Sequence, residues 1–337
     1  MKKLTRLIDF VFVTLLLPLL LSLVVYYGFF TNYTGGLFSE TGFHRQYFDG
    51  IYKYRLLGRE LLLGLHSLIA DKTLFAWIFS RFEPRALYLF DSEGTTIFYG
   101  SYFLLNTFFL CLATMMLYVL FARHLDEKLK PHRNLLILTA VLLMTITQYV
   151  VVPYDTLSYF FLILAILLIL QKGWASYILL LVVVTLATLT RETAVFILAF
   201  YVAVYYMPLL AKNRLHWQKL AGLLIAFGTT YFLLRLLING NNAIFQKILL
   251  FRNVTNPSAI GGILLFAVIS YALINHSHNF HNSLLFLFLS APYILMVIFV
   301  ANPWEIRLWT PVWLVLLISG VIFIPDLSQH RQGNIDP

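Results

Sequence analysis

Long apolar runs, separated by short polar turns, fill most of the chain. A membrane-spanning helix needs about 20 apolar residues. Ten apolar runs lie near residues 8–30, 97–122, 134–152, 157–171, 174–190, 193–210, 219–238, 259–275, 283–301 and 309–325. The pattern predicts an all-α fold, a polytopic transmembrane helical bundle of about 10 spans. Residues 1–337 would form a single integral membrane domain.

The segment between the first two runs, residues 31–96, is the longest one outside the predicted spans. Within it, residues 59–82 place apolar side chains at helical spacing between charged ones. That pattern is typical of an amphipathic helix at a membrane interface. We therefore expect a long first extracytoplasmic loop with an interfacial helix, onto which a lipid-borne substrate could slide. The alternative is a helix that only packs on the bundle.

Composition supports a membrane protein and excludes several other classes. Hydrophobic residues make up 60% of the chain, charged residues 12%, and the mean hydropathy is +0.82, values outside the soluble range. The net charge is +9, but Lys and Arg are scattered over short loops, so no nucleic-acid partner is expected. The single cysteine, Cys111, lies in an apolar run and can form no internal disulfide.

The distribution of basic residues predicts the orientation of the chain. Lys2, Lys3 and Arg6 precede the first run, which favours a cytoplasmic amino terminus because short cytoplasmic loops carry an excess of Lys and Arg. Alternation then places most other basic loops on the same side. We expect a multi-pass integral membrane protein with both termini cytoplasmic, in a bacterial inner or plasma membrane.

The same alternation places the charged turns between apolar runs on the opposite, outer side. These turns carry Asp155, Arg191, Glu192, Glu305 and Arg307. Charges at helix ends that face one compartment are costly to keep without a use, so the pattern indicates a shared site. An arginine below the lipid headgroups is well placed to bind a phosphate, because its guanidinium group donates two parallel hydrogen bonds.

Each of these turns also has a simpler interpretation. Asp155 could be a helix N-cap, and the adjacent Arg191 and Glu192 could merely mark a turn. Trp304 and Trp309 are typical of interfacial anchors. Glu305 and Arg307 are two residues apart, so on a helix they need not pair with each other, and either could meet Arg191 or Asp155 instead.

A second group of chemically active side chains lies shortly after the first run, in residues 39–60. A transferase with a hydroxyl acceptor needs a carboxylate to take the proton, and cations to hold a phosphate. The candidates are Glu40, His44, Arg45, Asp49, Tyr54 and Arg55. Asp49 is favoured as the base because it lies among aromatic residues and precedes Gly50, and Glu40 is the competing base. A solvated surface loop would also be charged.

Other motifs are missing or weak. The chain has no Walker A loop, no G-x-G-x-x-G motif and no serine elbow, so nucleotide-driven chemistry is not expected. His276, His278 and His281 have no cysteine or paired carboxylate nearby, and a polar loop is the better interpretation. We assign no metal ligand, and a divalent cation stays open as a cofactor.

The architecture and four short motifs together resemble the membrane-embedded GT-C glycosyltransferases. The motifs are FDGIYKYR in the first outer loop, the turns PYDTLSYF and TRETA, and the late EIRLW. The resemblance covers most of the chain. It implies a polyprenyl-phosphate-linked sugar as donor, a glycan, lipid or protein acceptor outside the cytoplasm, and a role in cell-envelope polysaccharide or glycoconjugate biosynthesis.

The resemblance also implies roles for individual residues. A carboxylate in the first outer loop acts as base in an inverting transfer, which falls on Asp49 first and Glu40 second. Substrate binding falls on His44, Arg45, Tyr54, Arg55, Asp155, Arg191, Glu192, Glu305 and Arg307. Many members carry two neighbouring carboxylates after the first span, whereas this chain has no such pair.

Two other classes of function remain as alternatives. A transporter or lipid flippase would place ionisable residues at mid-span depth on several helices, but Asp9 and Arg235 lie near the ends of predicted spans. A non-catalytic subunit of an envelope polysaccharide assembly complex would use the outer charges to bind protein. The predicted chemistry favours the transferase.

Overall fold

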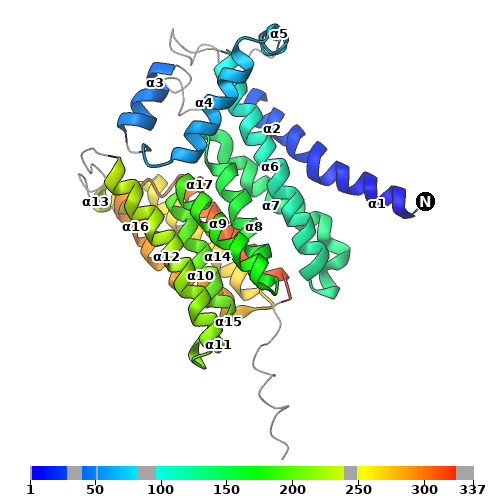
Figure 1. The fold of residues 1–337 in the computed structure, drawn as a ribbon, viewed down its shortest axis with the longest axis vertical. Coiled ribbons are helices and arrows are strands. Elements are labelled where there is room, and N and C mark those ends of the chain that lie inside the picture. The colour runs from blue at the N-terminus through cyan, green and yellow to red at the C-terminus, as the bar shows by residue number, and fades with distance from the viewer. Residues whose placement is uncertain (1, 29–39, 51, 82–95, 239–248, 324–337) are drawn as a thin grey trace, which may run out of the picture.

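The computed structural model describes residues 2–28, 40–50, 52–81, 96–238 and 249–323 (Figure 1). Throughout these ranges the secondary structure is helical, with one isolated bridge between Leu125 and Ile322 and no strand. The all-α prediction is therefore confirmed for the described part of the chain.

In the amino-terminal part, residues 2–81, the helices after the first long one lie over one end of the bundle (Figure 1). The elements of this part are α1 (Lys2–Val11), η1 (Phe12–Leu16), α2 (Leu17–Gly28), α3 (Glu40–His44), η3 (Arg45–Asp49), α4 (Leu56–Ala70) and α5 (Thr73–Arg81). The remaining elements form the bundle itself. They are α6 (Thr96–His124), η5 (Glu127–His132), α7 (Arg133–Ile146), η6 (Thr147–Tyr149), α8 (Asp155–Leu170), α9 (Trp174–Thr190), η7 (Glu192–Ala194), α10 (Val195–Val204), α11 (Tyr206–Leu210), α12 (Arg214–Leu237), α13 (Leu250–Thr255), α14 (Pro257–Asn275), α15 (Phe280–Leu289), α16 (Ala291–Val300) and α17 (Ile306–Val321).

The described helices include several that can cross a membrane, although the predicted count of ten is not confirmed. By length and composition, five qualify: Leu7–Gly28, Thr96–His124, Glu127–Tyr149, Arg214–Leu237 and Pro257–Asn275. The bent pair α15 and α16, at 46°, would make a sixth. Pro292 explains the bend, because proline cannot donate the hydrogen bond that would continue α15 into α16. Helices α8, α9 and α17, and Glu192–Val204, are apolar but shorter.

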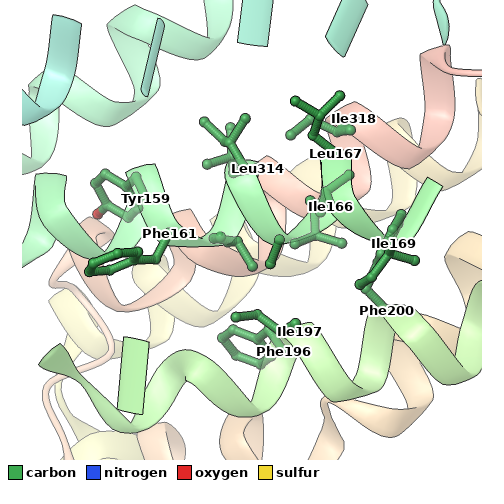
Figure 2. Packing of buried hydrophobic residues seen from close by; sticks show 14 of the residues in the cluster. Tyr159, Phe161, Ile166, Leu167, Ile169, Phe196, Ile197, Phe200, Leu314 and Ile318 are labelled. Carbon is green, nitrogen blue, oxygen red and sulfur yellow. The ribbon is translucent and has the colours of Figure 1, made fainter. Parts of the chain in front are cut away.

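Three of the short apolar helices, α8, α10 and α17, form the centre of the bundle. Helix α8 packs against α6, α9 and α10, and α17 packs against α7, α14 and α15. Figure 2 shows Ile166 and Ile169 of α8 beside Phe196 and Phe200 of α10, with Leu314 of α17 nearby. Most residues of α8 and α17 are buried among other helices. The site therefore lies at the end of an enclosed core.

The segment predicted as one amphipathic interfacial helix is two helices instead. Asp71 and Lys72 separate α4 from α5, and α4 packs against α6 and α9. Its Leu62 and Ile69 are buried, whereas Leu68 is exposed, like Trp77 of α5. Helix α4 thus packs on the bundle and also leaves apolar side chains exposed, and its place at a membrane interface stays a prediction. Residues 31–39 and 82–95 of the predicted loop lie outside the described residues.

Candidate functional site

The break between α9 and α10 brings an arginine into the interior, next to Asp155. Helix α9 ends at Thr190, Arg191 is extended, with φ −165° and ψ 148°, and η7 begins at Glu192. The Arg191 side chain is 3% exposed and that of Asp155 is 0% exposed. Arg191 Nη1 donates to Asp155 Oδ1 over 2.6 Å. Two of the predicted outer turns therefore meet in a buried ion pair.

Asp155 does not act as the helix N-cap that the simpler interpretation suggested. Tyr154 holds the N-cap position of α8, and Asp155 is the first helical residue. Its Oδ1 faces Arg191, while its buried Oδ2 has no hydrogen-bond partner among the described residues. One carboxylate oxygen of Asp155 therefore accepts from Arg191, and the other oxygen accepts no hydrogen bond among the described residues.

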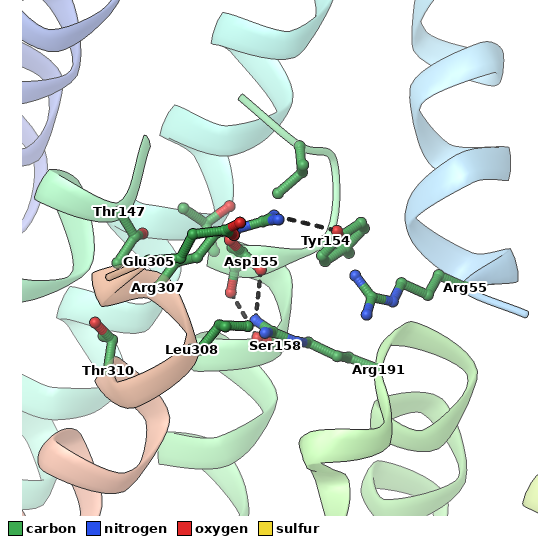
Figure 3. Close-up of polar contacts among 12 residues, drawn as sticks. Arg55, Thr147, Tyr154, Asp155, Ser158, Arg191, Glu305, Arg307, Leu308 and Thr310 are labelled. Atoms are coloured by element: carbon green, nitrogen blue, oxygen red, sulfur yellow. Dashed lines mark hydrogen bonds and ion pairs between the residues drawn. The ribbon is translucent and has the colours of Figure 1, made fainter. Parts of the chain in front are cut away.

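The third outer turn joins the same cluster through Arg307. Its Nε donates to Glu305 Oε2 over 2.9 Å, and its other nitrogens donate to the hydroxyls of Tyr154 (3.3 Å) and Tyr52 (3.4 Å). Glu305 and Arg307 do pair with each other. Glu305 precedes the first turn of α17, with φ −78° and ψ 98°, so helical spacing does not separate the two side chains. Figure 3 shows Arg307, Asp155 and Arg191 around Tyr154.

Trp309 is not the interfacial anchor that the sequence suggested. Its side chain is buried, its indole N–H donates to the carbonyl of Pro303 over 2.7 Å, and its ring stacks on Phe266 at 4.2 Å. Trp304 lies 5.2 Å from the guanidinium of Arg252. Trp309 thus fixes the start of α17, on which Arg307 is carried.

Arg55 reaches the cluster from the first loop, immediately before α4. Its guanidinium lies over the rings of Tyr154 and Tyr52, at 4.1 and 4.6 Å from their centroids. Its Nη2 is 3.5 Å from Glu192 Oε2. Gly58 permits this approach, since a Cβ there would lie 2.8 Å from the carbonyl oxygen of Pro153. Figure 3 shows Arg55, just before the start of α4, directed at Tyr154.

A fourth arginine, Arg235 in the last turn of α12, approaches the same glutamate. Its Nη2 is 3.7 Å from Glu192 Oε1, and its guanidinium lies 3.9 Å from the centroid of Tyr54. A small pocket is lined by Tyr54, Arg55, Thr188, Arg191, Glu192, Tyr231, Leu234 and Arg235. The sequence alone places Arg235 only near the end of a predicted span.

Electrostatics keep this pocket charged. Burial lowers the pKa of Arg55, but Tyr154 and Glu192 raise it, and the net shift is upward. Burial raises the pKa of Glu192, but Arg55, a backbone N–H, Arg191 and Arg235 together hold it below its ordinary value. Both groups are therefore ionised at neutral pH, and Glu192 is a weaker base than a free glutamate.

A buried polar network behind the cluster holds the Tyr154–Asp155 turn in place. The amide nitrogen of Asn106, in α6, donates to the carbonyl of Val152 (3.0 Å) and to the hydroxyl of Tyr26 (2.7 Å). Its amide oxygen accepts from the hydroxyl of Thr156 over 2.6 Å. Asn106 is thus hydrogen-bonded to Val152 before the turn and to Thr156 after it, on either side of Tyr154 and Asp155.

We expect Asn106→Leu to lower the free energy of unfolding by about 1–3 kcal/mol, because it leaves buried donors and acceptors without partners. Asn134→Leu is the matched control, since Asn134 is exposed and bonds to Asp9 near the other end of α6. Thermal unfolding in detergent measures both variants. Equal losses for the two would show that the Asn106 network does not stabilise the turn.

Three other first-loop candidates, Asp49, His44 and Arg45, lie outside the buried cluster. The Asp49 carboxylate is 73% exposed and 3.7 Å from His44 Nδ1, and His44 stacks on Phe48 at 4.3 Å. Arg45 is exposed. Glu40 begins α3, and its side chain lies outside what the structure describes. Among the predicted first-loop residues whose side chains the structure describes, only Tyr54 and Arg55 join the predicted outer turns.

Tyr47 connects these two groups. It is fully buried, stacks on Phe43 at 4.4 Å, and lies 5.5 Å from Tyr52 and 6.3 Å from Tyr154 between ring centroids. The segment that carries Asp49 is therefore packed directly on the tyrosines that contact Arg55 and Arg307. Tyr47, Tyr52 and Tyr154 were not singled out from sequence, although each lies within five residues of a predicted site residue.

The part of the chain that the structure describes contains no group of three or more His, Cys, Asp or Glu residues placed to hold a metal ion. Comparison with known proteins finds no matching family model, no matching curated protein and no matching solved structure.

Proposed function

We propose that this chain is an integral membrane glycosyltransferase that moves a sugar from a polyprenyl-phosphate donor to an extracytoplasmic hydroxyl acceptor. The observation that carries the proposal is the gathering of four arginines, Arg55, Arg191, Arg235 and Arg307, from separate stretches of sequence. Three carboxylates, Asp155, Glu192 and Glu305, lie among them. Four positive and three negative charges leave one net positive charge, which suits a phosphodiester.

The arginines would act on the leaving group. When the bond between sugar C1 and the phosphate oxygen breaks, the phosphate gains a negative charge, and preorganised guanidinium groups stabilise that charge. Tyrosine rings hold Arg55 and Arg235 in place, so little reorganisation is needed. A lipid-borne donor also fits a chain whose described helices are long and apolar enough to cross a membrane.

The base that best fits is Asp49. The carboxylates of Asp155 and Glu305 are buried against arginines, and the low pKa of Glu192 weakens it as a base. Asp49 is exposed on a segment that covers the arginine cluster. Its carboxylate would take the proton from the acceptor hydroxyl as the oxygen attacks C1 and the phosphate departs on the opposite face. Glu40 remains the second candidate for this role.

A transfer assay with radiolabelled sugar tests the proposal. Membranes from cells with and without the chain receive polyprenyl-phosphate sugars labelled in the sugar. We expect loss of the labelled donor and release of polyprenyl phosphate only when the chain is present, with a loss of about tenfold or more of that rate in Arg307→Gln. Movement of labelled donor across the membrane without release of polyprenyl phosphate would point to a flippase and contradict the transferase.

A further inference from the structure

One carboxylate in the cluster is held much more loosely than the others. The Arg191–Asp155 and Arg307–Glu305 pairs span 2.6 and 2.9 Å, and all four side chains are buried. Glu192 instead lies 3.5 Å from Arg55 and 3.7 Å from Arg235, and its side chain is 37% exposed. It is the cluster carboxylate with an arginine on each side and a close bond to neither.

The two arginines around Glu192 are arranged to bind an oxyanion. Each guanidinium lies over a tyrosine ring, Arg55 on Tyr154 and Arg235 on Tyr54. Stacking occupies the face of the guanidinium and leaves its N–H edges free to donate in its plane. Arg55 Nε is buried and has no hydrogen-bond partner in the described part of the chain. The pocket thus offers more donors than Glu192 uses.

Beside the pocket, helix α12 presents an exposed apolar face that lipid could cover. Arg235 lies in the last turn of α12, and Phe232 and Leu236 on the same helix are 65% and 74% exposed. A hydrocarbon chain lying along this apolar face would bring a phosphate at its end to Arg235. The lining residues Tyr231 and Leu234 lead from that face into the pocket.

We infer that Glu192 occupies a phosphate subsite between Arg55 and Arg235, and that the phosphate group of a polyprenyl phosphate displaces it. The identity of the lipid rests on the proposed function, whereas the phosphate subsite rests on the geometry of these residues. Glu192 has space to move because it is partly exposed, while the two tight ion pairs stay in place. When no ligand is bound, the glutamate offsets one of the two positive charges of Arg55 and Arg235, and it competes with the phosphate.

Binding of farnesyl phosphate to the detergent-solubilised full chain tests this inference, with no sugar transfer involved. Removing a competing partly exposed charge should strengthen binding, so we expect Glu192→Gln to bind farnesyl phosphate about three- to tenfold more tightly than the wild type. Arg235→Gln should bind about tenfold more weakly. Glu60→Gln is the matched control, since Glu60 also pairs with an arginine, Arg59, but outside the pocket.

Parallel measurements with inorganic phosphate and with farnesol distinguish the possible ligands. Strong binding of farnesyl phosphate alone supports a lipid phosphate, and equal binding of inorganic phosphate would assign the site to a free anion instead. The inference is overturned if Glu192→Gln binds no more tightly than the wild type or Glu60→Gln, or if farnesol binds as well as farnesyl phosphate. Melting temperatures of every variant confirm that each is folded.

This experiment separates the inference from the proposed function. If Glu192→Gln binds farnesyl phosphate more tightly but the wild type transfers no sugar, the subsite stands and the transferase does not. If the wild type transfers sugar but Glu192→Gln leaves binding unchanged, the transferase stands and the role of Glu192 is wrong.

Discussion

Arg191→Met is expected to lower the free energy of unfolding by about 3–5 kcal/mol, because it leaves the Asp155 carboxylate buried without its partner. Asp155 is 0% exposed, and Arg191 is its hydrogen-bond partner at 2.6 Å. Water cannot take the place of the lost guanidinium at such a position without opening the bundle. Thermal and denaturant unfolding of the purified chain in detergent measures the effect.

Two further variants identify the cause of that loss. The double variant Asp155→Leu with Arg191→Met removes both charges, and we expect it to be much more stable than Arg191→Met alone, since a buried pair can be replaced by apolar residues at little cost. Lys130→Met breaks the exposed pair with Glu127 and should cost about 1 kcal/mol or less. A double variant as unstable as Arg191→Met would mean that packing, and not the unpaired charge, explains the loss.

The grouping of the outer turns could be predicted from sequence, but the pairing within the group could not. Asp155, Arg191, Glu305 and Arg307 are conspicuous because each interrupts an apolar run, and alternation of spans places them at one end. Which carboxylate meets which arginine depends on helix rotation and on where each helix begins. The extended backbone of Arg191 and the non-helical Glu305 have no signature in hydropathy.

The tyrosines and Arg235 were harder to recognise for a different reason. A tyrosine next to an apolar run is ordinary in a membrane protein, so Tyr154 gave no sign that it would flank Arg55. Tyr52 was one of several aromatic residues in the charged first loop. Arg235 is separated from Glu192 by more than 40 residues, and only the packing of α12 on α9 brings the two together. Contacts of this kind come from tertiary structure alone.

The predicted count of ten spans is not confirmed, and hydropathy alone explains why. Hydropathy detects apolar residues but does not tell whether lipid or protein surrounds them. The runs near 157–171 and 309–325 are as apolar as the others, yet they correspond to the short, buried helices α8 and α17. The helices that carry Asp155 and Arg307 are thus enclosed by other helices, which places the charged cluster inside the protein.

The largest expected effect on activity is that of Asp49→Asn, which should reduce sugar transfer by about 10²–10⁴-fold, the usual contribution of a positioned general base. Asparagine has nearly the same shape but cannot accept the proton of the acceptor hydroxyl. Because the Asp49 side chain is 73% exposed, the substitution should leave the melting temperature and the binding of farnesyl phosphate unchanged. The measurement is the initial rate of polyprenyl phosphate release at saturating donor.

Asp71→Asn is the matched control, because Asp71 is also an exposed carboxylate of the first loop, at the end of α4, and we expect it to transfer at the wild-type rate. Glu40→Gln tests the competing assignment. If Glu40→Gln abolishes transfer and Asp49→Asn does not, the base is Glu40. Should neither variant slow transfer in a folded protein that still binds farnesyl phosphate, the first loop supplies no base, and the arginine cluster would then serve binding without the proposed catalysis.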